Sequence, residues 1–221
     1  MPRRTPERRD LRGATYNLDN NRDDFRVVTE VAKLFRVAGL DFCAYQEGQE
    51  YADNLAAMPQ VALHTTRGKG PSERDAGILT RTDVPTRGYT LTRTRQQWPR
   101  DKGPGLHWPR SIPGVVVDWL RVYSVHMPRQ HHQLAYATVW TALLMLAIRR
   151  DGPMILVGDW NKGPMRNGAF TPRLLAKVIG GQVYGDGIDY VIARGCVVDE
   201  IHRIDIGGSD HRPVVFTVRS A

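Results

Sequence analysis

The sequence predicts one domain of mixed α and β structure in which two β-sheets pack against each other. At 221 residues the chain suits one hydrophobic core or at most two small ones. Strand-like apolar runs dominate its second quarter and its end, and two helical segments lie between groups of strands. We identify no internal repeat, low-complexity tract or linker in the sequence. These observations favour a single layered domain.

The first half of the chain alternates strands with one helix. A short strand over 14–18 precedes a helix from Phe25 to Ala38, which Asp23 or Asp24 can cap and Gly39 ends. Further strands are predicted at 41–46, 61–65, 76–81 and 88–94, before an irregular stretch rich in proline and glycine. A long strand from Val115 to Val125 follows.

The second half opens with the strongest helix, which we predict over 131–150. Its apolar face recurs at helical spacing, with Leu134, Ala137, Trp140, Leu144 and Ile148. A strand at 154–157 and a short helix at 172–179 come next, and strands at 188–193, 197–204 and 214–218 end the chain.

The composition indicates the cellular compartment in which the protein is expected. The hydrophobic share is 41%, and no apolar segment is long enough to cross a bilayer. The basic N-terminus has no apolar segment behind it, so we expect no secretory signal. Cys43 and Cys196 lie in apolar, strand-like runs and are expected to be reduced core residues. We therefore expect a cytoplasmic protein with no membrane contact.

The net charge of +8 is concentrated in two segments. Residues 1–12, a basic tail that can be disordered, carry a net +3, and residues 86–110 carry a net +5. The remaining 20 basic and 20 acidic residues cancel. Such clustering is what a polyanion-binding surface needs, since phosphate contacts dominate that affinity. The alternative is a solvated basic loop and tail.

Polar residues gather where two predicted apolar strands begin or end. The strand at 154–157 leads into Gly158-Asp159-Trp160-Asn161, and Ser209-Asp210-His211-Arg212 precedes the last strand. Strand ends that carry such side chains form the active sites of many α/β proteins. A hydrolytic metal site is therefore the leading hypothesis. The alternative for Asp159 and Asn161 is an Asx turn.

An ordered series of such residues resembles the endonuclease/exonuclease/phosphatase superfamily, which includes deoxyribonuclease I. The series is Asn17, Gln46-Glu47, Ser124-Val125-His126, Gly158-Asp159-Trp160-Asn161, Ile188-Asp189-Tyr190 and Ser209-Asp210-His211-Arg212-Pro213-Val214. The resemblance runs from about Ala14 to Val215. It implies an α+β fold, the four-layer α/β/β/α sandwich of two packed mixed β-sheets flanked by helices, with residues 13–221 forming one catalytic domain.

The resemblance also implies roles for the residues of the series. Glu47, Asn17 and Asp210 would face Mg²⁺ or Mn²⁺, hard cations that prefer oxygen ligands. Asp159 would orient or deprotonate the attacking water, and Asn161 would donate to the phosphate. His211 would donate to a phosphate oxygen, with Asp189 fixing its tautomer.

The resemblance implies that a histidine at the position of His126 is typical of deoxyribonuclease I-like and sphingomyelinase-like members. In the deoxyribonuclease I-like members this histidine pairs with an acid at a strand start. Asp75 and Glu73 are the two candidates for that acid. Arg81, at the end of the same predicted strand, is a candidate phosphate contact, and its alternative is an exposed strand-end arginine.

The basic segment indicates the substrate class. Its cations are interleaved with aromatic rings, the composition of a surface that binds phosphates and bases. The predicted nucleic-acid-binding residues are Arg81, Arg87, Arg93, Arg95, Trp98, Arg100, Lys102, Trp108 and Arg110. Local packing is the alternative for the two tryptophans.

We predict a Mg²⁺- or Mn²⁺-dependent nuclease that acts on DNA, with RNA as a second candidate, and that is a monomer. The alternatives are a phosphoesterase acting on small-molecule or lipid phosphoesters, and a catalytically silent nucleic-acid-binding module on the same scaffold.

Overall fold

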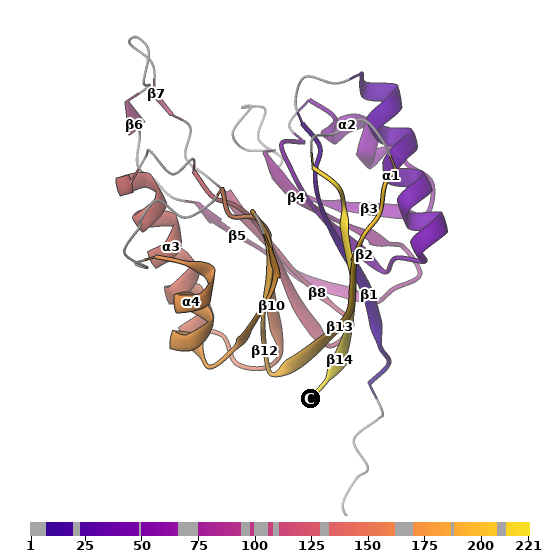
Figure 1. Ribbon diagram of the computed structural model, residues 1–221. Helices are drawn as coiled ribbons and strands as arrows, with labels where there is room; N and C mark the ends of the chain where they lie inside the picture. Colours follow the sequence, from indigo (N-terminus) through magenta and orange to yellow (C-terminus); the bar gives the residue numbers. More distant parts are fainter. Residues whose placement is uncertain are drawn as a thin grey trace, which may run out of the picture.

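The structure is a computed structural model that describes residues 8–19, 23–48, 50–65, 75–93, 98–99, 106–107, 111–128, 133–161, 170–186, 188–206 and 211–221. Within them, two six-stranded mixed sheets pack face to face and helices lie on their outer sides (Figure 1). This is the α/β/β/α sandwich predicted from the sequence.

The first sheet has the strand order β13-β14-β1-β2-β4-β3. Its strands are β1 (Leu11–Asn17), β2 (Phe42–Gln46), β3 (Val61–His64), β4 (Ala76–Arg81), β13 (Cys196–Arg203) and β14 (Val214–Ser220). Helices α1 (Asp24–Ala38) and α2 (Ala52–Ala56) lie outside it. The buried face of α1, with Val27, Val31 and Leu34, packs in one cluster with Tyr16 and Cys43 of the sheet.

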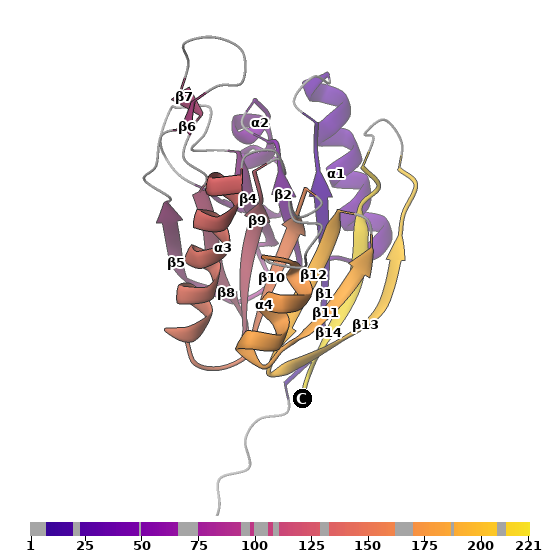
Figure 2. The ribbon, with the colours of Figure 1, turned by 60° about the vertical axis from the view of Figure 1, so that its left-hand side comes forward.

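The second sheet has the order β11-β12-β10-β9-β8-β5. Its strands are β5 (Thr86–Arg93), β8 (Ser111–Val117), β9 (Leu120–His126), β10 (Met154–Asp159), β11 (Gln182–Asp186) and β12 (Asp189–Arg194). Helices α3 (Gln133–Ile148) and α4 (Pro172–Ile179) cover its outer face (Figure 2). Strands β6 (Trp98–Pro99) and β7 (Leu106–His107) form a separate two-stranded sheet.

The central core lies between the sheets. Phe42, Ala44 and Ile78 of the first sheet pack with apolar residues such as Val122 and Ile155 of the second. Each sheet contains one parallel pair, β1 with β2 and β9 with β10. Because the carboxyl ends of parallel neighbours lie at the same edge, these two pairs deliver their last residues to one end of the sandwich.

The structure corrects one long predicted element. The strand expected from Val115 to Val125 is a hairpin, β8 and β9, which turns at Asp118 and Trp119. Asp118 has a φ of 54°, a left-handed conformation, and its amide donates to the Pro85 carbonyl. The apolar run continues across the turn without glycine or proline, so the sequence carries no strong turn signal there.

Smaller differences concern elements that the sequence pattern did not predict. These are α2, β6, β7 and β11. Strand β1 begins at Leu11, inside the range expected to be tail, and Arg9 just before it pairs with the buried Asp41 at 3.1 Å. Cys43 and Cys196 are free and buried, as expected. Among the described residues, no helix combines the length and apolarity needed to cross a membrane.

Candidate active site

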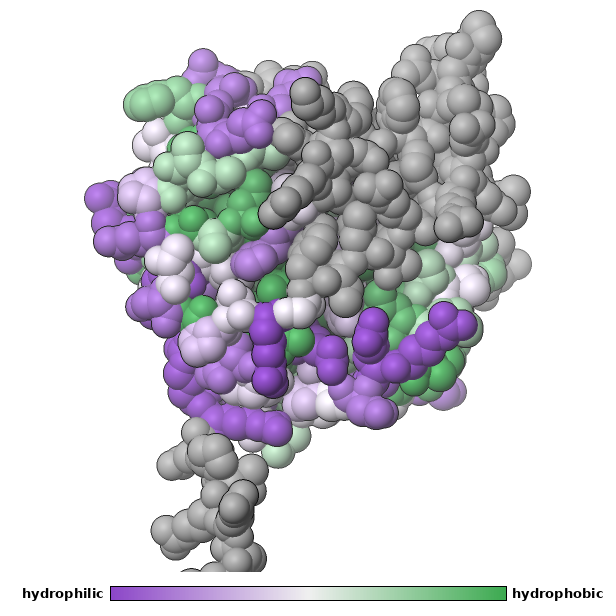
Figure 3. All heavy atoms as spheres, turned by 180° about the vertical axis from the view of Figure 1, so that it is seen from behind, coloured by the Kyte–Doolittle hydropathy of each residue, from purple (hydrophilic) through white to green (hydrophobic). Residues whose placement is uncertain are grey.

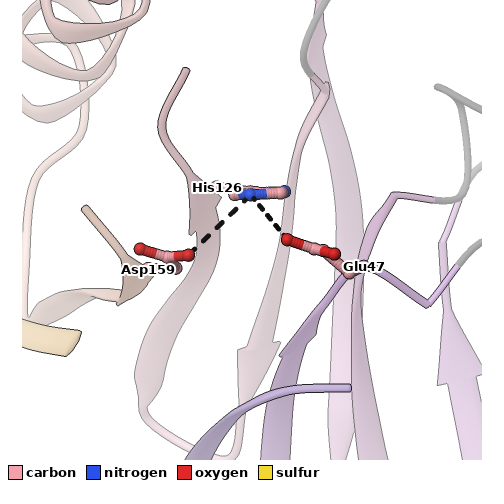
Figure 4. A group of neighbouring side chains, drawn as sticks. All are labelled: Glu47, His126 and Asp159. Atoms are coloured by element: carbon pink, nitrogen blue, oxygen red, sulfur yellow. Dashed lines mark ion pairs between the residues drawn. The ribbon is translucent and has the colours of Figure 1, made fainter. Parts of the chain in front are cut away.

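Three titratable side chains from both sheets converge at the end where the parallel pairs finish. Glu47 follows β2, His126 ends β9 and Asp159 ends β10. Ligand atoms of all three lie within 4.8 Å of one another. The His126 ring lies between the two carboxylates (Figure 4), with its Nε2 3.7 Å from Glu47 Oε1 and 3.9 Å from Asp159 Oδ2.

Asn17, at the end of β1, connects these two carboxylates. Its amide nitrogen donates to Glu47 Oε1 at 3.2 Å and to Asp159 Oδ2 at 3.1 Å. Its carbonyl oxygen accepts from the backbone amide of Asp19. The amide thus holds the acids of the two sheets in a fixed relation.

His126 is oriented by an acid on its other side. Its Nδ1 lies 2.8 Å from Asp75 Oδ2, and both residues are buried. A carboxylate only accepts, so Nδ1 carries the proton and Nε2 faces Glu47 and Asp159. Of the two acids that the sequence offered, Asp75 makes this contact. Glu73 lies outside the described residues.

Asp159 is almost fully buried, with 1% exposure. This burial raises the pKa of its carboxyl above the ordinary value, and the charge of Asp189 acts in the same direction. His126, the Asn161 amide and His211 act against that shift. A carboxylate with a raised pKa is a better proton acceptor, which suits the role in activating water expected for Asp159.

Asp189 and His211 form the second acid–imidazole contact. Asp189 lies opposite Asp159 in the β10–β12 register, and its Oδ1 is 3.5 Å from His211 Nδ1. The carboxylates of Asp159 on β10 and Asp189 on β12 are therefore neighbours, and the His211 imidazole lies beside Asp189. Asp210 lies outside the described residues.

Asn161 differs from its expected position. The expectation was that Asp159 and Asn161 point the same way on an extended segment, but β10 ends at Asp159 and Asn161 has a φ of 45°. Its backbone amide donates to Asp159 Oδ1 at 2.7 Å, which is an Asx turn. Its side-chain amide donates to the Met127 carbonyl at 2.7 Å. Asn161 therefore holds the ends of β9 and β10 together.

A buried polar network beneath the site was not assigned a role from the sequence. Gln46 donates to Ser124 Oγ at 3.1 Å and accepts from Thr15, and Ser124 donates to the Tyr45 carbonyl. All three side chains are buried, so these bonds join the sheets directly under Glu47 and His126. The sequence signal that could have indicated this network is the presence of polar residues inside otherwise apolar strands.

The donor set fits a divalent cation. The carboxylates of Glu47 and Asp159 lie close together because both accept from the Asn17 side-chain amide. Two carboxylates so close concentrate negative charge, which a hard divalent cation neutralises. Of the three predicted ligands, Glu47 is at the cluster with its carboxylate, whereas Asn17 presents its amide nitrogen there and its oxygen accepts from Asp19. His126 Nε2 lies in the same group of metal-ligand atoms, although the predicted ligands did not include it.

Two predicted phosphate contacts lie at the opposite end of the sandwich. Strand β4 runs antiparallel to β2, so Arg81 is about 17 Å from the Glu47 end at ~3.4 Å per residue, and it pairs with Asp41 and Asp83. Arg87 lies opposite Val116, also at that far end. The sequence pattern did not determine the direction in which each strand runs. It therefore did not show at which end of the sandwich Arg81 and Arg87 lie.

The rest of the basic segment begins at the site end. Arg93 ends β5 opposite Ser111, the residue at which β8 begins. The β6–β7 pair, which includes Trp98, stands at the same end of the molecule as the last residues of β1 and β10 (Figure 1). Arg95, Arg100, Lys102, Trp108 and Arg110 lie outside the described residues.

Solved structures with the same fold include proteins of different activities. Similar folds occur in an endonuclease/exonuclease/phosphatase from Beutenbergia cavernae (18% identity, 96% of this chain and 72% of that chain, TM-score 0.65). They also occur in the endonuclease domain of the telomere-specific retrotransposon TRAS1 (14%, 96% and 99%, 0.61). A third is a mannosyl-6-phosphatase from Bacteroides thetaiotaomicron (15%, 94% and 99%, 0.63).

No curated protein matches the chain in sequence. The model of the endonuclease/exonuclease/phosphatase family, however, matches residues 14–211, which include every residue of the cluster described above. The chain belongs to the endonuclease/exonuclease/phosphatase family.

Proposed function

We propose that the chain is a divalent-metal-dependent nuclease that hydrolyses DNA, with RNA as a second substrate. The observation that carries the proposal is the meeting of Glu47, His126 and Asp159 within 4.8 Å at one end of the sandwich. Phosphodiester hydrolysis needs charge neutralised at the phosphoryl oxygens, a water aligned for attack and a proton for the leaving oxygen. The cluster contains a group for each requirement.

The proposed mechanism assigns each requirement to a residue. Glu47, with Asp210, would hold Mg²⁺ or Mn²⁺, which when bound neutralises charge on the phosphate, and Asn17 holds Glu47 beside Asp159. Asp159 accepts a proton from the attacking water, assisted by its raised pKa. His211, with protons on both ring nitrogens, would direct Nδ1–H to Asp189 and donate Nε2–H to a phosphate oxygen. His126, with Nδ1–H on Asp75, would in its doubly protonated form give its Nε2 proton to the leaving oxygen.

Charge favours nucleic acid among the phosphoesters that this family cleaves. The chain has a net charge of +8, and the segment 86–110 contributes a net +5. Part of that segment, Arg93 and the β6–β7 pair, stands at the site end. A polymer with one charge per phosphate gains most from such a surface. The similar endonuclease domain of TRAS1 shows that the fold accommodates this activity.

A sugar phosphate is the second candidate, because a similar structure is a mannosyl-6-phosphatase. The test is a panel of a labelled single-stranded DNA, the matching RNA, a duplex and mannose 6-phosphate, each with Mg²⁺ or Mn²⁺. His211→Ala is the inactive control. We expect cleavage of DNA that His211→Ala abolishes. Release of phosphate from the sugar alone would replace the nuclease proposal with the phosphatase one.

A further inference from the structure

A second concentration of positive charge lies far from the active site. It surrounds an open cavity of about 370 Å³ beside the start of β9, the β8–β9 turn and the loop after α3. The residues that shape it are Arg87, Val116, Trp119, Arg121, Arg150 and Asp151. In the view from behind, hydrophilic side chains gather along the lower edge of the molecule, the end away from the active site (Figure 3).

The cavity is separated from the catalytic cluster by the length of a strand. Arg121 is the second residue of β9 and His126 is its last, a separation of about 17 Å at ~3.4 Å per residue. Arg121, Tyr123 and Val125 alternate onto the outer face of the sheet, where Tyr123 and Val125 pack with residues of α3. The cavity thus lies on that outer face, beyond the end of α3.

Three arginines line this cavity. Among the described residues of the lining, Asp151 is the one acidic side chain, against Arg87, Arg121 and Arg150. Within the part of the chain that the structure describes, Arg87 and Arg150 form no ion pair, and both are exposed. Arg121 uses Nε to donate to the Asp151 carbonyl, which leaves its terminal nitrogens for another acceptor.

The loop that presents Arg150 is fixed in place. Arg194 donates to the carbonyls of Ala147, Arg150 and Gly152, so the backbone after α3 is tied to β12. Those bonds also occupy carbonyl oxygens at the end of α3, whose partial negative charge would otherwise repel an anion. The backbone that carries Arg150 is therefore fixed beside the cavity.

An aromatic ring adds a second kind of contact. Trp119 lines the cavity, and its indole nitrogen donates to the Arg9 carbonyl at 2.9 Å. The Arg8 guanidinium lies 5.6 Å from the centre of the same ring. The chain segment just before β1 therefore adds a fourth cation beside this cavity.

From these contacts we infer a second, non-catalytic binding site, formed by Arg87, Trp119, Arg121 and Arg150, for the phosphate of a nucleotide. Guanidinium groups bind phosphate through paired hydrogen bonds, and an indole ring offers a surface for a base. The phosphate belongs either to a free nucleotide or to a nucleotide within a strand. The site does not depend on the catalytic proposal, because it shares no residue with the catalytic cluster.

The test is equilibrium binding in EDTA, so that no metal draws the ligand to the catalytic end. The probes are AMP, measured by calorimetry, and a labelled 12-nucleotide strand, measured by anisotropy. The variants are Arg150→Glu and Arg87→Glu, with Arg36→Glu as the matched control. Arg36 is an exposed arginine in the last turn of α1, on the other outer layer of the sandwich.

We expect AMP to bind about tenfold or more weakly to Arg150→Glu and Arg87→Glu, and unchanged to Arg36→Glu. If the 12-nucleotide strand binds and AMP does not, and Arg150→Glu and Arg87→Glu bind the strand more weakly than Arg36→Glu does, the phosphate that the site binds belongs to a strand. Equal affinities in all the proteins, equal losses in Arg150→Glu and Arg36→Glu, or no binding of either probe would overturn the inference.

Discussion

Asp75 contacts the cluster of the candidate active site at His126, where its Oδ2 lies 2.8 Å from Nδ1. Replacing it with Asn keeps the size of the side chain, but removes the charge that fixes the Nδ1 proton. We expect Asp75→Asn to lower kcat by about 100-fold or more while the KM changes little, because the effect falls on the reacting centre. Steady-state kinetics checks this, with Asp83→Asn, an exposed acid at the far end, as the control. A wild-type kcat in Asp75→Asn would remove His126 from the mechanism.

At the scale of single residues, strand ends were easier to predict than side-chain directions. The sequence pattern indicated Asn17, Glu47, His126 and Asp159 as a group, and the structure brings them together. Asn161 was misplaced because the chain leaves the extended conformation directly after β10. Arg81 was misplaced because a strand's direction depends on its partner, and the pattern of one strand does not contain its partner.

At the scale of elements, the close pairing of β9 and β10 depends on one glycine. Gly158 has a φ of 149°, and an added Cβ would collide with the Val125 carbonyl on β9 and approach Gln46 Nε2. We expect Gly158→Ala to lower the free energy of unfolding by about 3 kcal/mol or more, measured by urea denaturation. Gly152→Ala is the control, with a φ of 84° but open space around it, and should cost about 1 kcal/mol. Equal losses would contradict this close contact.

The edge pair β3–β4 contains a pH-sensitive histidine. Burial lowers the pKa of His64 below its ordinary value of 6.5, and its ring contacts Thr80 Oγ1 at 2.8 Å. The unfolded chain therefore takes up a proton at a higher pH than the folded chain, so stability falls as pH drops below 6.5. We expect His64→Gln to reduce that fall in denaturation curves from pH 7.5 to 5. His202→Gln, on the exposed edge strand β13, should retain it, and an identical fall in both variants would contradict this role.

At the scale of the whole molecule, the two-sheet sandwich was predictable because its strands read as separate apolar runs with clear breaks. The α/β/β/α order of the layers was predicted from the resemblance of six ordered motifs to the endonuclease/exonuclease/phosphatase superfamily. The β8–β9 hairpin was not predictable in the same way, since no glycine or proline stands between Val117 and Leu120 and Asp118 adopts a left-handed conformation without a glycine signal. Tertiary pairing, rather than local pattern, determines that turn.

The distribution of charge leads to a prediction for the whole molecule. If the basic segment 86–110 is the nucleic-acid surface, each lost phosphate contact removes a released counterion. We expect Arg93→Gln/Arg95→Gln/Arg100→Gln to weaken DNA binding and to flatten its dependence on salt, by about 0.9 in slope for each contact on duplex DNA. Anisotropy at several salt concentrations checks this, and an unchanged slope would place the DNA elsewhere.

The central claim is that the cluster around Asp159 performs metal-dependent hydrolysis of a phosphodiester. The most direct measurement is incubation of the protein with supercoiled plasmid in Mg²⁺, Mn²⁺ or EDTA, in parallel with Asp159→Asn, whose fold is checked by circular dichroism. We predict nicking by the wild type with either metal, none in EDTA and none by folded Asp159→Asn. Nicking in EDTA, or nicking by Asp159→Asn at the wild-type rate, would contradict the claim, as would an intact plasmid under every condition.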